Sequence, residues 1–165
     1  MKKRKESVFQ DASSFIAAFF ISGAFAYGVL SLTGNFFHKL AAESSSRLAK
    51  NFFETTIVSE GFFPHLQGVV GGSFFDAEIN DLCSGRLELA VMAGLVFASR
   101  DKPVAERIKG IFLGALVLLA FNPLRIFLTL SAIGTPFLVL VHDVLFRISL
   151  VIVLVTFYAL WYYWK

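Results

Sequence analysis

Four stretches of the sequence are almost wholly apolar and are separated by polar segments: 12–37, 83–99, 108–133 and 137–164. Within the first stretch, the run from Phe15 to Leu32 extends about 27 Å as a helix, close to the hydrocarbon thickness of a bilayer. Basic residues at 2–5 and in the turn that begins at Arg100 are typical of cytoplasmic ends. The pattern therefore predicts a bundle of about four transmembrane helices with both termini in the cytoplasm.

Two interpretations fit the first apolar stretch. Ala24-Phe25-Ala26 has the small residues of a signal-peptidase site, so the stretch could belong to a cleaved signal peptide. The apolar run continues past this triplet to Leu32, and polar residues separate it from the basic residues at 2–5. We therefore favour a retained span. Both interpretations place the segment that follows outside the cytoplasm.

The segment 34–82 differs from the rest of the chain in composition, with an acidic excess that favours the extracytoplasmic side. Apolar positions three or four residues apart from Phe37 to Phe52 predict a short amphipathic helix at the membrane surface. The stretches 55–59 and 69–79 are rich in Val, Ile, Thr and Phe and are bounded by glycines, which predicts one or two β-hairpins. The expected fold is an all-α membrane bundle that carries this small extracytoplasmic insertion.

Composition supports the same class of protein. The chain has 165 residues, of which 56% are hydrophobic, and its mean hydropathy is +0.70. A soluble domain of this size rarely carries so much apolar surface, so we expect a single multi-pass domain, 1–165, in the cell membrane. The net charge of +3 comes largely from residues 2–5, a run without aromatic residues. This run favours a membrane anchor over nucleic-acid binding.

Three chemically reactive side chains are expected at one depth of the bundle. Counted from the polar end of each helix, Arg125, Cys83 and His142 lie about 24 Å, about 26 Å and about 34 Å from the cytoplasmic side. Cys83 is the single cysteine of the chain, and inert packing is the common role of such a residue. Its expected place at a helix N-terminus, with Arg86 one turn further on, instead favours a reactive thiolate.

Charged side chains inside membrane spans are costly and usually mark functional sites, so Arg125 is a candidate catalytic residue. The same cost requires a partner for Glu88, which we expect to be Arg86 or Arg125. The histidines are far apart in sequence, and no His-x-x-His or Cys-x-x-Cys spacing exists, which argues against a metal site. The chain also lacks a glycine-rich phosphate loop and a Gly-x-Ser-x-Gly elbow, so no cofactor is expected.

Three motifs occur in a fixed order on successive apolar stretches: Cys83-Ser84-Gly85, Asn122-Pro123-Leu124-Arg125-Ile126 and Val141-His142-Asp143-Val144-Leu145-Phe146-Arg147. In this order and spacing the chain resembles the exosortase/archaeosortase family of membrane-embedded cysteine transpeptidases. The resemblance covers Thr55 to Lys165. The chain is short for that family and looks like a minimal core version of it.

The resemblance implies a role for each reactive residue. Cys83 would be the nucleophile, Arg125 the second catalytic residue and His142 the third, with Arg147 as the alternative third residue. We further expect Arg86, Glu88 and Asn122 to bind substrate. The implied partners are membrane lipid and exported proteins whose C-terminal signal has a short motif, a hydrophobic helix and a basic tail.

The expected chemistry is attack of the Cys83 thiolate on a backbone carbonyl of the substrate, which gives an acyl-thioester that an amine, a lipid-linked acceptor or water resolves. Arg125 would stabilise the oxyanion, and His142 would carry the proton to the departing amine. The alternative is a membrane protein without enzymatic activity, such as a transporter subunit or an assembly factor. In that case Arg125 and His142 would line a polar pathway.

Overall fold

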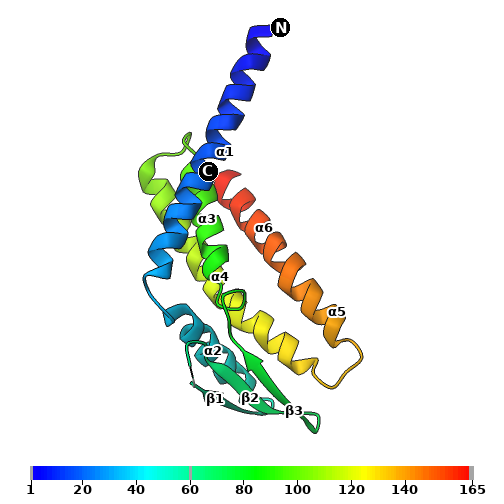
Figure 1. Ribbon diagram of the computed structural model, residues 1–165. Coiled ribbons are helices and arrows are strands. Elements are labelled where there is room, and N and C mark those ends of the chain that lie inside the picture. The colour runs from blue at the N-terminus through cyan, green and yellow to red at the C-terminus, as the bar shows by residue number, and fades with distance from the viewer. Residues whose placement is uncertain (1, 60, 164–165) are drawn as a thin grey trace.

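Figure 1 shows the computed structural model, an elongated molecule with packed helices at one end and a helix on a small sheet at the other. The structure describes residues 2–59 and 61–163, with side chains at 11–59, 61–144, 148–149 and 151–163. The side chains of the basic run 2–5 and of Arg147 therefore lie outside the described part.

The elements follow one another in mixed order along the chain: α1 (Lys2–Ser31), α2 (Phe36–Ala49), β1 (Glu54–Val58), β2 (His65–Val70), β3 (Ser73–Glu78), α3 (Arg86–Ala98), α4 (Val104–Ser131), α5 (Leu138–Asp143), the π-helical segment η1 (Val144–Ser149) and α6 (Leu150–Tyr163). α3 runs antiparallel to α1 and α4, and the sheet is joined to the end of α3 that begins at Arg86 (Figure 1).

The prediction of an all-α bundle of about four transmembrane helices is wrong. The protein is about 66% helical and has a three-stranded antiparallel sheet. Among the described residues, two helical segments are long and apolar enough to cross a membrane, Asp11–Ser31 and Val104–Ser131. This number is smaller than a four-span bundle requires.

Local backbone structure explains why fewer apolar stretches form long helices than the sequence predicts. The second apolar stretch becomes helical only at Arg86, because Gly85 takes a left-handed conformation with φ of 76°. The 13 residues of α3 extend about 20 Å, against a hydrocarbon core of about 30 Å. The final apolar stretch is divided by η1 into α5 of 6 residues and α6 of 14 residues. Apolar length alone therefore overstated the number of spans.

Small residues bring α1 and α3 into close contact. A Cβ atom on Gly94 would lie 3.0 Å from the carbonyl oxygen of Phe19 and 3.1 Å from the Cα of Gly23. Ser22 Oγ donates to the carbonyl oxygen of Gly94 at 3.3 Å. The contact uses residues of α1 that precede Ala24-Phe25-Ala26. Cleavage at that triplet would remove them and uncover α3, and retention of α1 stays a prediction.

The sheet has the strand order β1-β2-β3, and both pairs of strands are antiparallel. Its inner face contributes Leu66 and Phe75 to a core with Ala42 of α2 and Ile126 of α4. The strands lie within the segment whose glycines and β-branched residues predict hairpins. α2 covers the sheet, so this layer is fixed against the second half of α4 (Figure 1).

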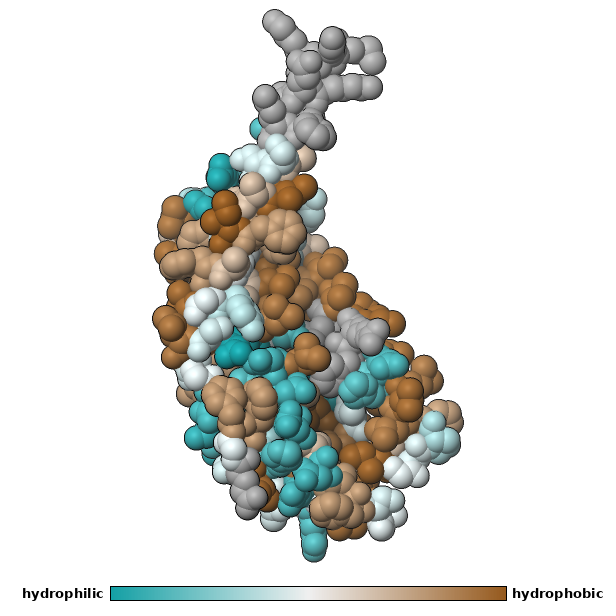
Figure 2. All heavy atoms as spheres, viewed as in Figure 1, coloured by the Kyte–Doolittle hydropathy of each residue, from teal (hydrophilic) through white to brown (hydrophobic). Residues whose placement is uncertain are grey.

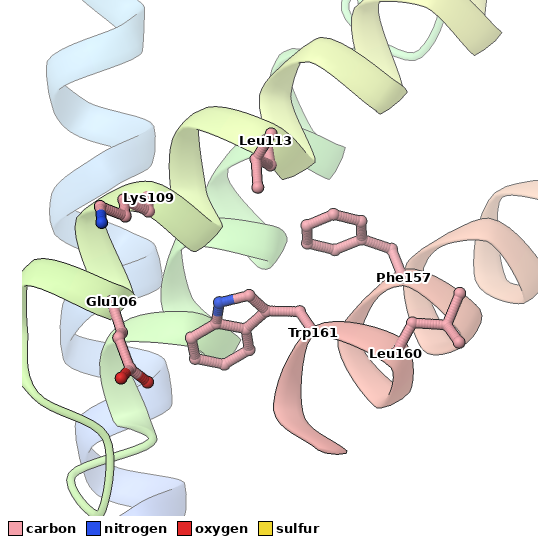
Figure 3. Close-up of a pocket in the computed structure, with 6 residues that line it drawn as sticks. All are labelled: Glu106, Lys109, Leu113, Phe157, Leu160 and Trp161. Atoms are coloured by element: carbon pink, nitrogen blue, oxygen red, sulfur yellow. The ribbon is translucent and has the colours of Figure 1, made fainter. Parts of the chain in front are cut away.

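A second core joins the first half of α4 to α6. A Cβ atom on Gly110 would lie 2.4 Å from Nε1 of Trp161, so the indole packs directly on the α4 backbone. Figure 3 shows Trp161 and Phe157 pointing from α6 toward α4, beside a pocket of about 500 Å³. This pocket lies in the half of α4 that does not contact the sheet.

The surface follows the same division. Figure 2 shows hydrophilic residues gathered over α2 and the strands, while hydrophobic residues cover the helices above them and the flank formed by α5 and α6. Large apolar side chains are exposed along the first candidate span, among them Phe20 and Phe25 at 65% and 74%. Such exposure over a long helix is expected for a surface that contacts lipid.

Candidate functional site

Cys83 lies in a short loop that connects β3 to α3. The side chain of Asn80 accepts from the Leu82 N–H at 3.1 Å, and its carbonyl oxygen accepts from the N–H groups of Cys83 and Ser84, each at 3.0 Å. Ser84 Oγ donates to the carbonyl oxygen of Asp81 at 2.9 Å. These bonds form a compact turn, and the left-handed Gly85 then redirects the chain into α3.

Two side chains of α4 hold this loop from the other side. Asn122 Nδ2 donates to the carbonyl oxygen of Cys83 at 2.8 Å, and Arg125 Nη2 donates to that of Leu82 at 3.1 Å. The two residues are three positions apart on a helix and therefore share one face. A Cβ atom on Gly85 would lie 3.4 Å from Asn122 Nδ2, which explains the close approach of loop and helix at this point.

Arg125 is completely buried, with an exposed fraction of 0%, and its charge has an acidic neighbour. Its Nη1 lies 3.9 Å from Oε1 of Glu88, a carboxylate that is itself 14% exposed. A buried guanidinium requires such compensation. The expectation that Glu88 pairs with Arg86 or Arg125 is confirmed, and the partner is Arg125.

Arg86 has a separate partner, Asp81, whose Oδ1 pairs with its Nη2. Its Nη1 donates to the carbonyl oxygen of Gly34 at 3.4 Å, and its guanidinium lies 5.5 Å from the ring centre of Tyr27. The same Asp81 oxygen lies 3.0 Å from Nε2 of His38, a fully buried residue of α2. The Cys83 loop is thereby tied to α1 and α2 as well as to α4.

The His38–Asp81 pair has no sequence signal, because the two residues are far apart in the chain and belong to no recognised motif. The apolar positions from Phe37 to Phe52 do not mark the inner face of α2 either, because the buried side chains of this helix include His38, Ala42 and Ser45. Asp81, which precedes α3, makes no capping bond, since α3 begins after Gly85 without a side-chain cap.

Burial raises the pKa of the Cys83 thiol above its ordinary value. Arg125 opposes the shift through its positive charge, whereas Glu88 and Glu78 add to it. The sequence favoured a thiolate because it placed Cys83 at a helix N-terminus. The structure differs, since α3 begins three residues later, at Arg86, and Cys83 lies in the loop before the helix.

The structure brings Cys83, Asn122, Arg125 and Glu88 into one cluster and places His142 on another element. His142 is on α5, its side chain is 49% exposed, and its Nδ1 lies 3.3 Å from Oδ1 of Asp143. α5 follows the turn at the end of α4 and lies on the far side of β3 from α2 (Figure 1). The role of His142 stays a prediction.

The expected substrate-binding residues all lie near Cys83, and each contacts another part of the chain. Asn122 binds the Cys83 carbonyl, Glu88 pairs with Arg125, and Arg86 pairs with Asp81. Asn122 Oδ1 and Glu88 Oε2 are buried and have no hydrogen-bond partner among the described residues. Within the same residues, no group of three or more His, Cys, Asp or Glu side chains is placed to hold a metal ion.

Comparison of the chain with models of known protein families, with curated proteins and with solved structures finds no match. The functional argument therefore depends on the residues of this chain and on their geometry.

Proposed function

We propose that the protein is a membrane-bound cysteine transpeptidase or peptidase whose nucleophile is Cys83. The observation that carries the proposal is the buried Arg125, which donates to the carbonyl directly before Cys83 and thus holds a fixed positive charge beside a half-buried thiol. A guanidinium in a site of low dielectric stabilises developing negative charge far more strongly than it does in water. The motif order described above supports the same assignment.

In the proposed reaction, the Cys83 sulfur bonds to a backbone carbonyl carbon of the substrate while a base takes the thiol proton. Negative charge develops on the carbonyl oxygen beside Arg125. The carbon–nitrogen bond then breaks, the departing amine takes the proton, and an acyl-thioester remains on Cys83. An amine, a lipid-linked acceptor or water attacks the thioester and frees the thiol. Because burial raises the pKa of Cys83, the first step needs a base.

His142 is the proposed base. Since α5 and the Cys83 loop belong to different elements, the substrate would lie between the imidazole and the sulfur. The substrates we propose are exported proteins with a C-terminal motif, a hydrophobic helix and a basic tail. The chain would cross the membrane more than once, and Cys83 would face the extracytoplasmic side together with the sheet.

The test is co-expression of the protein with a tagged exported protein that ends in a hydrophobic segment and a basic tail. We expect Cys83→Ala to abolish C-terminal processing, as detected by the size of the tagged product. Ser131→Ala is the matched control, because its exposed hydroxyl contacts only the carbonyl oxygen of Phe127 in its own helix. Unchanged processing in Cys83→Ala would exclude the enzyme and favour a membrane protein without catalytic function.

A further inference from the structure

β3 is an edge strand, and its register determines which backbone groups face away from the sheet. The N–H of Ile79 donates to the carbonyl oxygen of Pro64 at 2.9 Å, which makes this a hydrogen-bonded pair. Hydrogen-bonded and non-hydrogen-bonded pairs alternate along an antiparallel ladder. The register of β2 and β3 therefore makes Phe74, Asp76 and Glu78 members of non-hydrogen-bonded pairs. Their N–H and C=O groups point to the free edge.

This edge ends at the thiol. The carbonyl oxygen of Glu78 is the last outward-facing acceptor of β3, and Cys83 Sγ lies 4.0 Å from it. Among the described backbone hydrogen bonds outside helices and strands, none involves Phe74 or Asp76. A strand that paired with these two residues would lie about 4.8 Å from β3 and would lead to the sulfur.

We propose that the free edge of β3 binds the substrate as an extended strand and delivers its scissile carbonyl to Cys83. The proposal rests on the function proposed above and names the form in which substrate is recognised. A row of alternating backbone donors and acceptors is complementary to the main chain of a peptide. The occupant is therefore an extended polypeptide segment, bound through its backbone.

The direction of the bound strand follows from the substrate. Its hydrophobic helix lies after the scissile bond, so the extended part lies before it. For the carbonyl at the C-terminal end of that part to reach Cys83, the peptide runs parallel to β3, which itself runs toward the Cys83 loop. Parallel and antiparallel pairs commonly occur together in mixed sheets.

The exposed face of β3 adds a side-chain preference. Phe74 is 69% exposed, and Asp76 and Glu78 lie on the same face. Hydrogen bonds from His65 and Gln67 hold the pKa of Asp76 below its ordinary value, so its carboxylate stays charged. Cross-strand neighbours of opposite charge stabilise a sheet and like charges destabilise it. The edge therefore favours neutral or basic residues in the bound segment.

The experiment uses peptidyl chloromethyl ketones on the full-length protein in detergent, with the rate of Cys83 alkylation as the readout. Three forms of one tetrapeptide are compared: the parent and two that carry N-methyl groups on complementary, alternating amides. Strand addition uses only every second peptide N–H, so one methylation pattern should slow alkylation by about tenfold and the other should stay near the parent rate. Equal rates for the two patterns, whether fast or slow, would overturn the proposal.

A variant pair tests the same edge from the side of the protein. Asp76→Pro removes an outward-facing N–H and spares the ladder to β2, whereas Asp76→Ala removes the same carboxylate and keeps the N–H. The quantity compared is the rate of Cys83 alkylation by the parent peptide divided by the rate with iodoacetamide. We expect this preference for the peptide to be lost in Asp76→Pro and kept in Asp76→Ala. Iodoacetamide does not need the edge, so an unchanged rate with it shows that the Cys83 loop is intact. A retained preference in an intact Asp76→Pro protein contradicts the proposal.

The two proposals fail separately. If Cys83→Ala does not change processing while the alternating effect of N-methylation persists, the enzyme is excluded and the peptide-binding edge stands. If processing depends on Cys83 and the two methylated peptides react equally, the proposed enzymatic function is retained and substrate binding at the edge of β3 is excluded.

Discussion

Cys83 owes its position to side chains from other elements more than to the helix that follows it. Asn122 and Arg125 bind the carbonyls of Cys83 and Leu82, and Glu88 balances the guanidinium. Removing any one of these partners leaves a buried polar group unsatisfied, which typically costs about 1–3 kcal/mol and more for a charged group. The chemistry of the thiol is set by the same neighbours, because burial and the two opposite charges act on its ionisation together.

The pH dependence of Cys83 alkylation tests this arrangement. Since burial raises the pKa of the thiol, the rate with iodoacetamide should rise with pH through a midpoint above that of a free cysteine peptide. Glu88→Gln should move the midpoint to lower pH, because a negative charge that disfavours the thiolate is removed while Arg125 stays. Glu106→Gln, at the opposite end of α4, is the control and should leave the midpoint unchanged. A midpoint that does not respond to Glu88→Gln contradicts the assigned contact.

At the scale of elements, composition and periodicity located β1, β3 and the amphipathic helix of the polar segment but did not locate the ends of the apolar helices. A stretch rich in Val, Ile, Thr and Phe between glycines is a local signal, and β1 and β3 form where it occurs, whereas most of β2 lies between the two predicted stretches. The beginning of α3 depends on Gly85, whose left-handed turn is packed against Asn122 of another helix. A single sequence does not show that contact, so the apolar run from 83 to 99 looked longer as a helix than it is.

For the same reason, only part of the candidate site could be predicted from the sequence. Cys83 is the only cysteine, and Arg125 stands out as a charge in an apolar stretch, so both were visible in the sequence. The pairing of Glu88 followed from the cost of a buried charge. His38 and Asp81 were not visible as a pair, because only the packing of α2 against the Cys83 loop brings them together.

Because α1 and α3 are in close contact at one glycine and not at another, we expect alanine substitutions at these two positions to have opposite effects on stability. A Cβ atom on Gly28 would meet no other part of the protein within 4 Å, whereas a Cβ atom on Gly94 would lie 3.0 Å from the Phe19 carbonyl oxygen. Gly28→Ala should stabilise the protein by about 0.5–1 kcal/mol through helix propensity, and Gly94→Ala should destabilise it despite the same gain. Thermal unfolding in detergent measures both variants. A stabilised Gly94→Ala protein would show that α1 does not pack closely on α3.

At the scale of the whole molecule, the two candidate spans both end on the side of the sheet (Figure 1). The hydrophilic surface over α2 and the strands lies beyond the end of α1 and beside the second half of α4, and exposed apolar side chains cover the other helices (Figures 1 and 2). An unpaired charge or an open sheet edge is not tolerated within hydrocarbon, so the sheet belongs in water or at the interface. On the function proposed above, Cys83, at the junction of sheet and helices, would lie where an aqueous acceptor and a membrane-anchored substrate could meet.

Because both candidate spans run toward the sheet, a membrane that α1 and α4 both cross would place the sheet and the turn between α3 and α4 on opposite sides, with the short α3 and the loop before it returning the chain between them. In a Cys83→Ser background, Thr56→Cys places a thiol on the exposed face of β1, and Ala105→Cys places one in the exposed first turn of α4. In intact cells, a membrane-impermeant maleimide should label Thr56→Cys and should label Ala105→Cys only after permeabilisation. The two variants serve as controls for each other, because both sites react in permeabilised cells. Equal labelling of both in intact cells would place the sheet and the turn on one side and would remove the membrane crossing by α4 on which the location of Cys83 depends.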